Sequence, residues 1–243
     1  MNHALKMAVA GTLLAHCNLS SAITLNDDFS LALEAGVFSD YRMRGLSQTQ
    51  GDPAVQGSAT LLHSSGLYAG VWSSNVDFGL GSKTRQELDG YVGYYWQATD
   101  DVSLDVAWYK YVYPKVGGLN YSEYFAELKA YGAKLGGYYS DDLMGDQSML
   151  YSYLGYGFTL PGEVSLEARY GWVDYKDPVW ISASGATRDS YDEWEVKLGK
   201  NLFGLDWSLS YVDTDLSRAE CANYLGFDDL CSATLVAGVS KTF

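Results

Sequence analysis

The chain has 243 residues, 30 acidic and 16 basic side chains, and an aromatic content of 15% that includes 21 tyrosines. This length suits one large domain or two small ones. The formal net charge of −14 argues against a nucleic-acid-binding protein, because phosphate backbones are bound through Lys and Arg.

The first 22 residues have the pattern of a secretory signal peptide. Lys6 gives a positive start, Met7–Ala15 is apolar, and Ser20–Ala22 supplies small residues for cleavage. We therefore expect a signal peptide over 1–22 and a mature chain from Ile23. A membrane anchor is the alternative, but the apolar run is far shorter than the ~20 residues that cross a bilayer.

From Phe29 onward, apolar and polar residues alternate with period two, as in strands with two different faces. Val102, Leu104 and Val106 share one face of their segment, whereas Ser103 and Asp105 share the other. This alternation predicts twelve strands: 29–46, 54–63, 66–79, 86–97, 102–113, 121–131, 133–141, 148–159, 163–175, 190–202, 205–215 and 233–243.

The predicted connections alternate between long and short. The long ones are 47–53, 80–85, 115–120, 142–147, 176–189 and 216–232, and the short ones are 64–65, 98–101, 132, 161–162 and 203–204. Transmembrane barrels have short periplasmic turns and longer outer loops. We therefore predict an all-β fold, a transmembrane antiparallel up-and-down β-barrel over 23–243, in the outer membrane of a Gram-negative bacterium with both ends periplasmic. A soluble β-sandwich also alternates, but it has less reason to sort its loops by length.

Aromatic residues near strand ends predict two girdles at the membrane interfaces. The outer girdle would contain Phe38, Tyr41, Phe78, Tyr113, Trp172, Tyr175 and Tyr191, and the inner one Trp96, Phe158, Phe203 and Phe243. The terminal Phe243 closes an alternating strand, and we predict that the outer-membrane assembly machinery reads it as a signal.

Several segments carry a family resemblance. They are Ser39–Thr49 (SDYRMRGLSQT), Asp52–Gly57 (DPAVQG), Gly66–Trp72 (GLYAGVW), Ser74–Gly79 (SNVDFG), Tyr138–Asp142 (YYSDD) and the closing Lys241–Phe243. Together they resemble the TorF-type porin family of proteobacterial outer membranes, over nearly all of the mature chain. The resemblance implies an outer-membrane barrel with a pore, and it supplies no substrate-binding residues.

Charged residues on the polar parity are expected to point into the barrel, since a charge facing lipid at mid-bilayer costs ~2–4 kcal/mol. The predicted pore-lining set is Glu34, Arg42, Arg44, Glu87, Asp89, Asp105, Glu123, Glu127, Lys129, Glu167, Arg169, Glu193, Glu195 and Lys197; Asp40 and Asp206 share the parity. Without the signal, 15 basic and 30 acidic residues remain, a formal charge of −15.

This arrangement predicts a porin-like channel for passive diffusion of small hydrophilic solutes, favouring cations. The acids that would set the preference are Glu87, Asp89, Asp105, Glu123 and Glu127, and Arg42 and Arg44 would shape the constriction. The alternative is a structural or adhesive barrel, in which the same charges pair across a closed lumen and activity lies in loops 176–189 and 216–232.

Cys221 and Cys231 lie in one polar loop, and in an oxidising compartment they are predicted to form a disulfide. A metal pair is the alternative, but no His is near. Neither a metal site nor a cofactor is expected.

A lipid-active enzyme is the second alternative function. After signal cleavage His63 is the only ordinary base left, and it sits in a predicted periplasmic turn beside Ser64 and Ser65. We therefore expect no enzymatic activity. The expected partners are outer-membrane lipid and lipopolysaccharide, the assembly machinery and small hydrophilic solutes.

Overall fold

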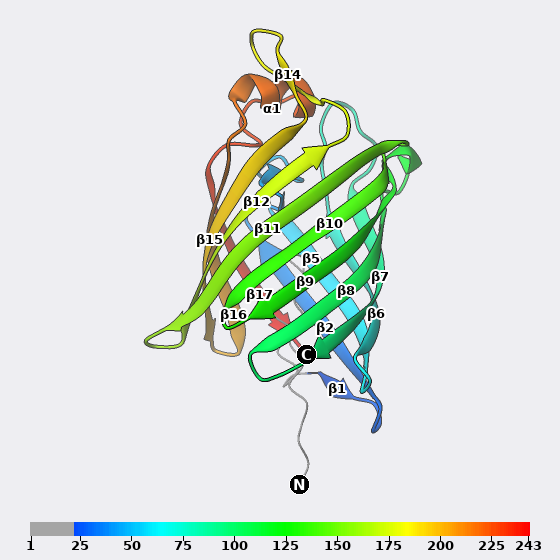
Figure 1. The fold of residues 1–243 in the computed structure, drawn as a ribbon, viewed down its shortest axis with the longest axis vertical. Coiled ribbons are helices and arrows are strands. Elements are labelled where there is room, and N and C mark those ends of the chain that lie inside the picture. The colour runs from blue at the N-terminus through cyan, green and yellow to red at the C-terminus, as the bar shows by residue number, and fades with distance from the viewer. Residues whose placement is uncertain (1–21) are drawn as a thin grey trace.

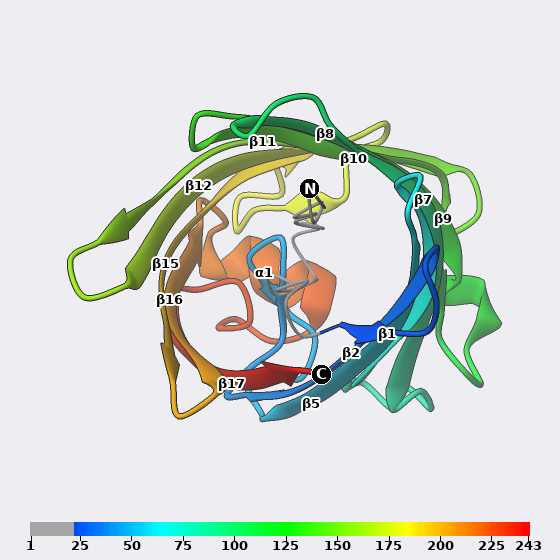
Figure 2. The ribbon, with the colours of Figure 1, turned by 90° about the horizontal axis from the view of Figure 1, so that it is seen from below.

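The structure is a computed structural model that describes residues 22–243. Twelve long strands form one closed antiparallel barrel, in which β2 pairs with β5 on one side and with β17 on the other (Figures 1 and 2). The barrel strands are β2 (Phe29–Phe38), β5 (Ala54–His63), β6 (Leu67–Asn75), β7 (Gln86–Gln97), β8 (Val102–Val112), β9 (Tyr121–Ala130), β10 (Ala133–Leu143), β11 (Gln147–Leu160), β12 (Val164–Tyr175), β15 (Ser190–Leu202), β16 (Leu205–Thr214) and β17 (Thr234–Thr242). The predicted fold class and the count of twelve barrel strands are confirmed.

The exterior of the barrel is an apolar band. Val55, Val71, Leu128 and Leu154 are 64%, 52%, 45% and 53% exposed, and each alternates with a residue on the inward parity. A closed barrel with an apolar outer band and a polar interior is the architecture of an outer-membrane protein. Within residues 22–243, no helix is both long and apolar enough to cross a membrane.

The long connections gather at one end of the barrel and the short turns at the other. The loop carrying α1 (Arg218–Leu225), and the one carrying β13 (Trp180–Ile181) and β14 (Thr187–Arg188), lie at the first end, whereas the C-terminus lies at the second (Figure 1). β1 (Ile23–Thr24) pairs with the start of β2 at that second end. The predicted signal peptide lies, except for Ala22, outside the described residues and stays a prediction.

Two predicted strands are too long. The first ends at Phe38 rather than at residue 46, and the third ends at Asn75 rather than at residue 79. The chain beyond Phe38 leaves the wall and forms a small hairpin of β3 (Arg42–Met43) and β4 (Leu46–Ser47). Its reversal uses Arg44 and Gly45 in the left-handed region, with φ of 51° and 83°.

The α1 helix was not predicted, although its capping signals are local. Ser217 caps its N-terminus in a reciprocal capping box with Glu220, and Gly226 ends it with a φ of 83°. The 3-10 turn η2 (Gly117–Leu119) lies in the β8–β9 connection.

The predicted outer aromatic girdle is wrong in part. Tyr41, Tyr113, Tyr175 and Tyr191 are only 2–6% exposed and belong to the interior. Three of them lie on the inward parity of the wall, and Tyr41 is carried inward by the turn after Phe38. In contrast, Trp172, Trp96, Phe158, Phe203 and Phe243 are 44–97% exposed.

Candidate functional site

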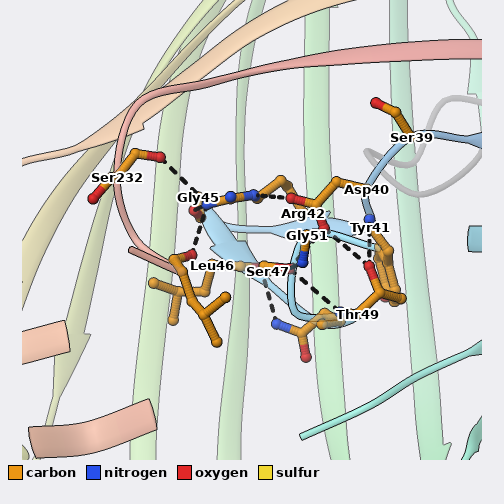
Figure 3. Close-up of polar contacts among 12 residues, drawn as sticks. Ser39, Asp40, Tyr41, Arg42, Gly45, Leu46, Ser47, Thr49, Gly51 and Ser232 are labelled. Carbon is orange, nitrogen blue, oxygen red and sulfur yellow. Dashed lines mark hydrogen bonds and ion pairs between the residues drawn. The ribbon is translucent and has the colours of Figure 1, made fainter. Parts of the chain in front are cut away.

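Residues 39–53, called the lumen hairpin below, fold from the long-loop end into the barrel. The Asp40 carboxylate organises the segment by accepting hydrogen bonds from Ser47 Oγ at 2.6 Å and Thr49 Oγ1 at 3.0 Å, together with an ion pair from Arg42 (Figure 3). Asp40 is 5% exposed, so these donors replace the water that the carboxylate loses.

Arg44, at the tip of the lumen hairpin, binds the opposite wall. Its Nη2 lies 2.7 Å from both carboxylate oxygens of Glu123 on β9. Its guanidinium carbon lies 5.2 and 5.0 Å from the ring centres of Tyr138 and Tyr151. The hydroxyl of Tyr191 donates to the Arg44 carbonyl at 2.9 Å. These contacts fix the hairpin across the lumen.

Arg42 ties the lumen hairpin to the outer loop that carries α1. Its Nη1 donates to the Leu230 carbonyl at 2.6 Å and approaches the Ser232 carbonyl at 3.4 Å (Figure 3). The Ser47 amide also donates to Leu230 at 2.9 Å. The predicted disulfide Cys221–Cys231 is present, with Cα atoms 5.9 Å apart, and it closes this loop directly beside those carbonyls.

The predicted pore-lining residues divide into two groups by burial. The buried acids, 0–3% exposed, are Glu87, Asp89, Asp105, Glu123, Glu127 and Glu193; the partly buried residues are Glu34, Arg42, Arg44, Lys129, Glu167, Arg169, Glu195 and Lys197. The wall residues of this set are thus buried or partly buried, and their role in lining a pore stays a prediction. Arg42 and Arg44, together with Asp40, reach the interior on the lumen hairpin and not on a continued first strand.

Tyrosine hydroxyls donate hydrogen bonds to most of the buried acids. Hydroxyls of Tyr68 and Tyr151 donate to Asp105 and Glu193 at 2.7 and 2.6 Å. Others donate in the same way: Tyr41 to Glu87, Tyr111 to Glu123 and Tyr153 to Glu127. Sequence reasoning missed this network, although Tyr68, Tyr111, Tyr151 and Tyr153 share the acids' parity; Tyr41 does not, and it reaches Glu87 from the lumen hairpin.

A cavity of about 150 Å³ remains between the lumen hairpin and the facing wall. Its lining residues are Phe38, Asp40, Tyr41, Arg42, Met43, Arg44, Gly45, Gln56, Tyr138, Tyr151, Arg169, Glu195, Lys197, Ser208, Ser210, Val212 and Val236. Arg169 is held by Glu193 at 3.1 Å and by Glu195 at 3.0 Å. Lys197 forms no ion pair with any described residue. The space is thus polar, largely ion-paired and narrow.

His63 lies in the β5–β6 turn, at the end opposite the long loops. Its Nδ1 accepts from the Ser65 amide at 3.1 Å and lies 2.8 Å from Ser65 Oγ, and its ring contacts Phe29. In the described part of the chain, no three His, Cys, Asp or Glu side chains are grouped to hold a metal.

Ion pairs of Arg188, called the Arg188 ion pairs below, join β14 to α1 over the mouth of the barrel, which α1 crosses in Figure 2. Arg188 pairs with Asp215 at 2.7 Å and with Glu220 at 2.8 Å. Partial burial acts to raise the pKa of Glu220, but hydrogen bonds from Ser217 and the charge of Arg188 outweigh it and lower the pKa below its usual value.

Acid is therefore expected to weaken the ion pair between Arg188 and Glu220. A carboxyl with a lowered folded-state pKa stabilises the fold above its unfolded value of ~4.3, and that contribution is lost as pH falls through the folded value. Amides of residues 218–225 should lose exchange protection, relative to intrinsic rates, between about pH 6 and about pH 3. In the variant Glu220→Gln, these amides should be weakly protected at both pH values. If the variant lost as much protection on acidification as the wild type, the effect would belong to another group.

Comparisons with known proteins fit the barrel described above. Residues 24–243 match a family model described as "Bacterial protein of unknown function (Gcw_chp)". No curated protein matches the sequence. The family model does not carry the TorF-type name, so that finer resemblance stays a prediction.

The solved structures that the barrel is similar to include two named porins. The KdgM porin gives a TM-score of 0.52 at 8% identity, covering 87% of this chain and 99% of that chain. The NanC porin gives 0.49 at 12%, covering 87% and 98%, and OccAB3 of Acinetobacter baumannii gives 0.41 at 10%, covering 91% and 66%. At 8% identity, the likeness to KdgM establishes the fold alone. By its family match, the chain belongs to the bacterial Gcw_chp family.

Proposed function

We propose that this protein is a porin-like outer-membrane channel that passes small hydrophilic solutes by passive diffusion. The observation that carries the proposal is the polar cavity of about 150 Å³ inside a closed, apolar-coated barrel. Its floor is the lumen hairpin, and its wall includes Ser208, Ser210 and Lys197, all on the inward parity of β15 and β16. A lumen with this lining solvates small polar solutes.

The lumen hairpin makes the proposed channel selective for small solutes. Arg44 crosses to Glu123, so the proposed passage follows the part of the lumen that is lined by β2, β5, β10 to β12 and β15 to β17. Swelling of proteoliposomes in uncharged solutes of graded size tests this proposal. We expect swelling with the smallest solutes and a steep decline with size. Absence of swelling in every solute, with correctly inserted protein, would favour the structural or adhesive barrel instead.

We further propose a modest preference for cations. The arginines at the cavity are matched by carboxylates, so their charges are largely balanced within the lumen. The protein as a whole carries 30 acidic and 16 basic side chains, and this excess of negative charge favours cations at the passage. Glu195 and Lys197 are the charged side chains of β15 at the passage itself, and they act in opposite directions.

Substitutions of these two residues should change the charge preference in opposite directions. Reversal potentials across a salt gradient should show cation preference in the wild type, reduced by Glu195→Gln and increased by Lys197→Gln, each by about twofold in permeability ratio. Glu163→Gln, in an exposed turn, is the matched control and should change nothing. Anion preference in the wild type would refute the proposal.

Phe243 is proposed as the signal for the assembly machinery. It is 47% exposed at the short-turn end of the barrel, and its amide donates to the Leu33 carbonyl at 2.8 Å. Deleting Phe243 should slow the appearance of heat-modifiable, inserted barrel in cells; an unchanged rate would remove this role.

A further inference from the structure

A second cavity, of about 420 Å³, lies at the long-loop rim of the barrel. Its lining residues are Val55, Ser73, Ser74, Asn75, Arg85, Gln86, Pro114 and Lys115. We call it the rim notch. Ser73 and Gln86 share the outward parity of Val71 and Leu88, which are 52% and 42% exposed on the apolar band. The rim notch therefore opens on the outside of the barrel, directly above lipid-facing residues.

The floor of the rim notch is held by hydrogen bonds. Gln86 Nε2 donates to Ser73 Oγ at 3.0 Å, and Ser73 Oγ donates to the Glu87 carbonyl at 2.8 Å. Asn75 accepts from the Val55 amide at 2.6 Å and donates to the Pro53 carbonyl at 3.0 Å. These bonds join β5, β6 and β7 into a fixed polar surface at the end of the apolar band.

Two cations flank this surface. Arg85 is oriented by hydrogen bonds from Nη1 to the carbonyls of Ser82 at 2.8 Å and Thr84 at 2.7 Å. Its Nη2 and Nε form no hydrogen bond with any residue of the described range 22–243. Its contact with Asp77 is long, at 3.6 Å, and its side chain is 59% exposed. Lys115 is exposed, and it forms no ion pair within residues 22–243. Two accessible cations at one notch are notable in a chain with a net charge of −14.

We propose that the rim notch binds a phosphate of lipid A, the phosphorylated glycolipid anchor of lipopolysaccharide. The long-loop end faces the outer leaflet if both termini are periplasmic, and lipid A carries both phosphates and acyl chains. A guanidinium and an ammonium match a phosphate in charge and in hydrogen-bond geometry. The acyl chains then cover Val55, Val71 and Leu88. One molecule therefore contacts both the cations of the rim notch and the adjoining apolar band.

Binding of purified, detergent-solubilised full-length protein to lipid A tests the assignment. Arg85→Ala/Lys115→Ala should weaken affinity about thirtyfold, because each of the two cations contributes on the order of 1 kcal/mol near such a lipid surface and about 1.4 kcal/mol is tenfold. Lys176→Ala/Arg218→Ala removes two exposed cations from other long loops and is the matched control, expected to bind like the wild type. Heat-modifiable migration in gels checks that each variant is a folded barrel.

Two further ligands identify what the rim notch recognises. The first is lipid A without phosphates. Its affinity for the wild type should be as low as the affinity of phosphorylated lipid A for Arg85→Ala/Lys115→Ala. Inorganic phosphate should compete only weakly, since it lacks the acyl chains. Equal affinity of both double variants, or full-strength binding of phosphate-free lipid A, would overturn the proposal. So would tight binding of inorganic phosphate with no binding of lipid A. None of these outcomes depends on channel activity.

Discussion

Replacing Arg44 with methionine is expected to destabilise the barrel by about 3–5 kcal/mol, because it leaves Glu123 buried without its cation. Glu123 is 0% exposed, and both of its carboxylate oxygens accept hydrogen bonds from Arg44 Nη2. Tyr111 still donates to one oxygen at 2.8 Å, but a neutral hydroxyl does not balance a carboxylate. Unfolding by urea in lipid vesicles measures the loss.

The same substitution should also raise conductance by about twofold, since the lumen hairpin loses its attachment to β9. The double variant Arg44→Met/Glu123→Gln separates the two effects. Removing both charges should restore much of the stability while leaving the tip of the hairpin detached from β9 and the conductance high. If Arg44→Met changed stability by less than about 1 kcal/mol, the ion pair would not be the anchor described above.

Loss of the disulfide is expected to loosen the lumen hairpin through the outer loop. The variant Cys221→Ser/Cys231→Ser should lose about 3 kcal/mol, the value expected for so short a ring in the chain-entropy description. Leu230 and Ser232, which accept from Arg42, flank Cys231 in sequence. Single-channel recordings should therefore show additional open levels in this variant, and dithiothreitol should produce the same levels in the wild type.

The variant Arg42→Met tests whether the disulfide acts through this contact. Adding Arg42→Met to the cysteine double variant should change the recordings little further, because both changes release the same attachment. Fully additive effects on the open levels would mean that the disulfide stabilises the outer loop without holding the hairpin.

The barrel can be predicted from the sequence because every strand that crosses the lipid must place apolar side chains outward at every second position. Val55, Val71 and Leu128 face hydrocarbon, so their neighbours must face inward, and the period-two pattern carries the whole wall. The α1 helix had a local signal too, the capping box of Ser217 and Glu220 followed by Gly226. The helix itself, RAECANYL, has no amphipathic pattern, so these caps are its only local sign.

The lumen hairpin could not be predicted from the sequence, for a different reason. Asp40, Arg42 and Arg44 continue the alternation of the first strand, so period alone cannot separate a longer wall from a turn inward. Gly45 is the one local sign of the reversal. The partners that fix the hairpin, Glu123 and Leu230, are 79 and 188 residues away from Arg44 and Arg42. Such contacts depend on the register of the whole barrel.

Planar-bilayer recording of the wild type beside a variant with residues 41–48 replaced by a short Gly-Ser linker tests the central claim most directly. The claim is a solute passage narrowed by the lumen hairpin. The wild type should give small, cation-favouring single-channel steps, and the shortened variant should give steps about twofold larger or more with weaker selectivity. Silent wild-type bilayers containing folded protein, or equal steps in both proteins, would contradict it.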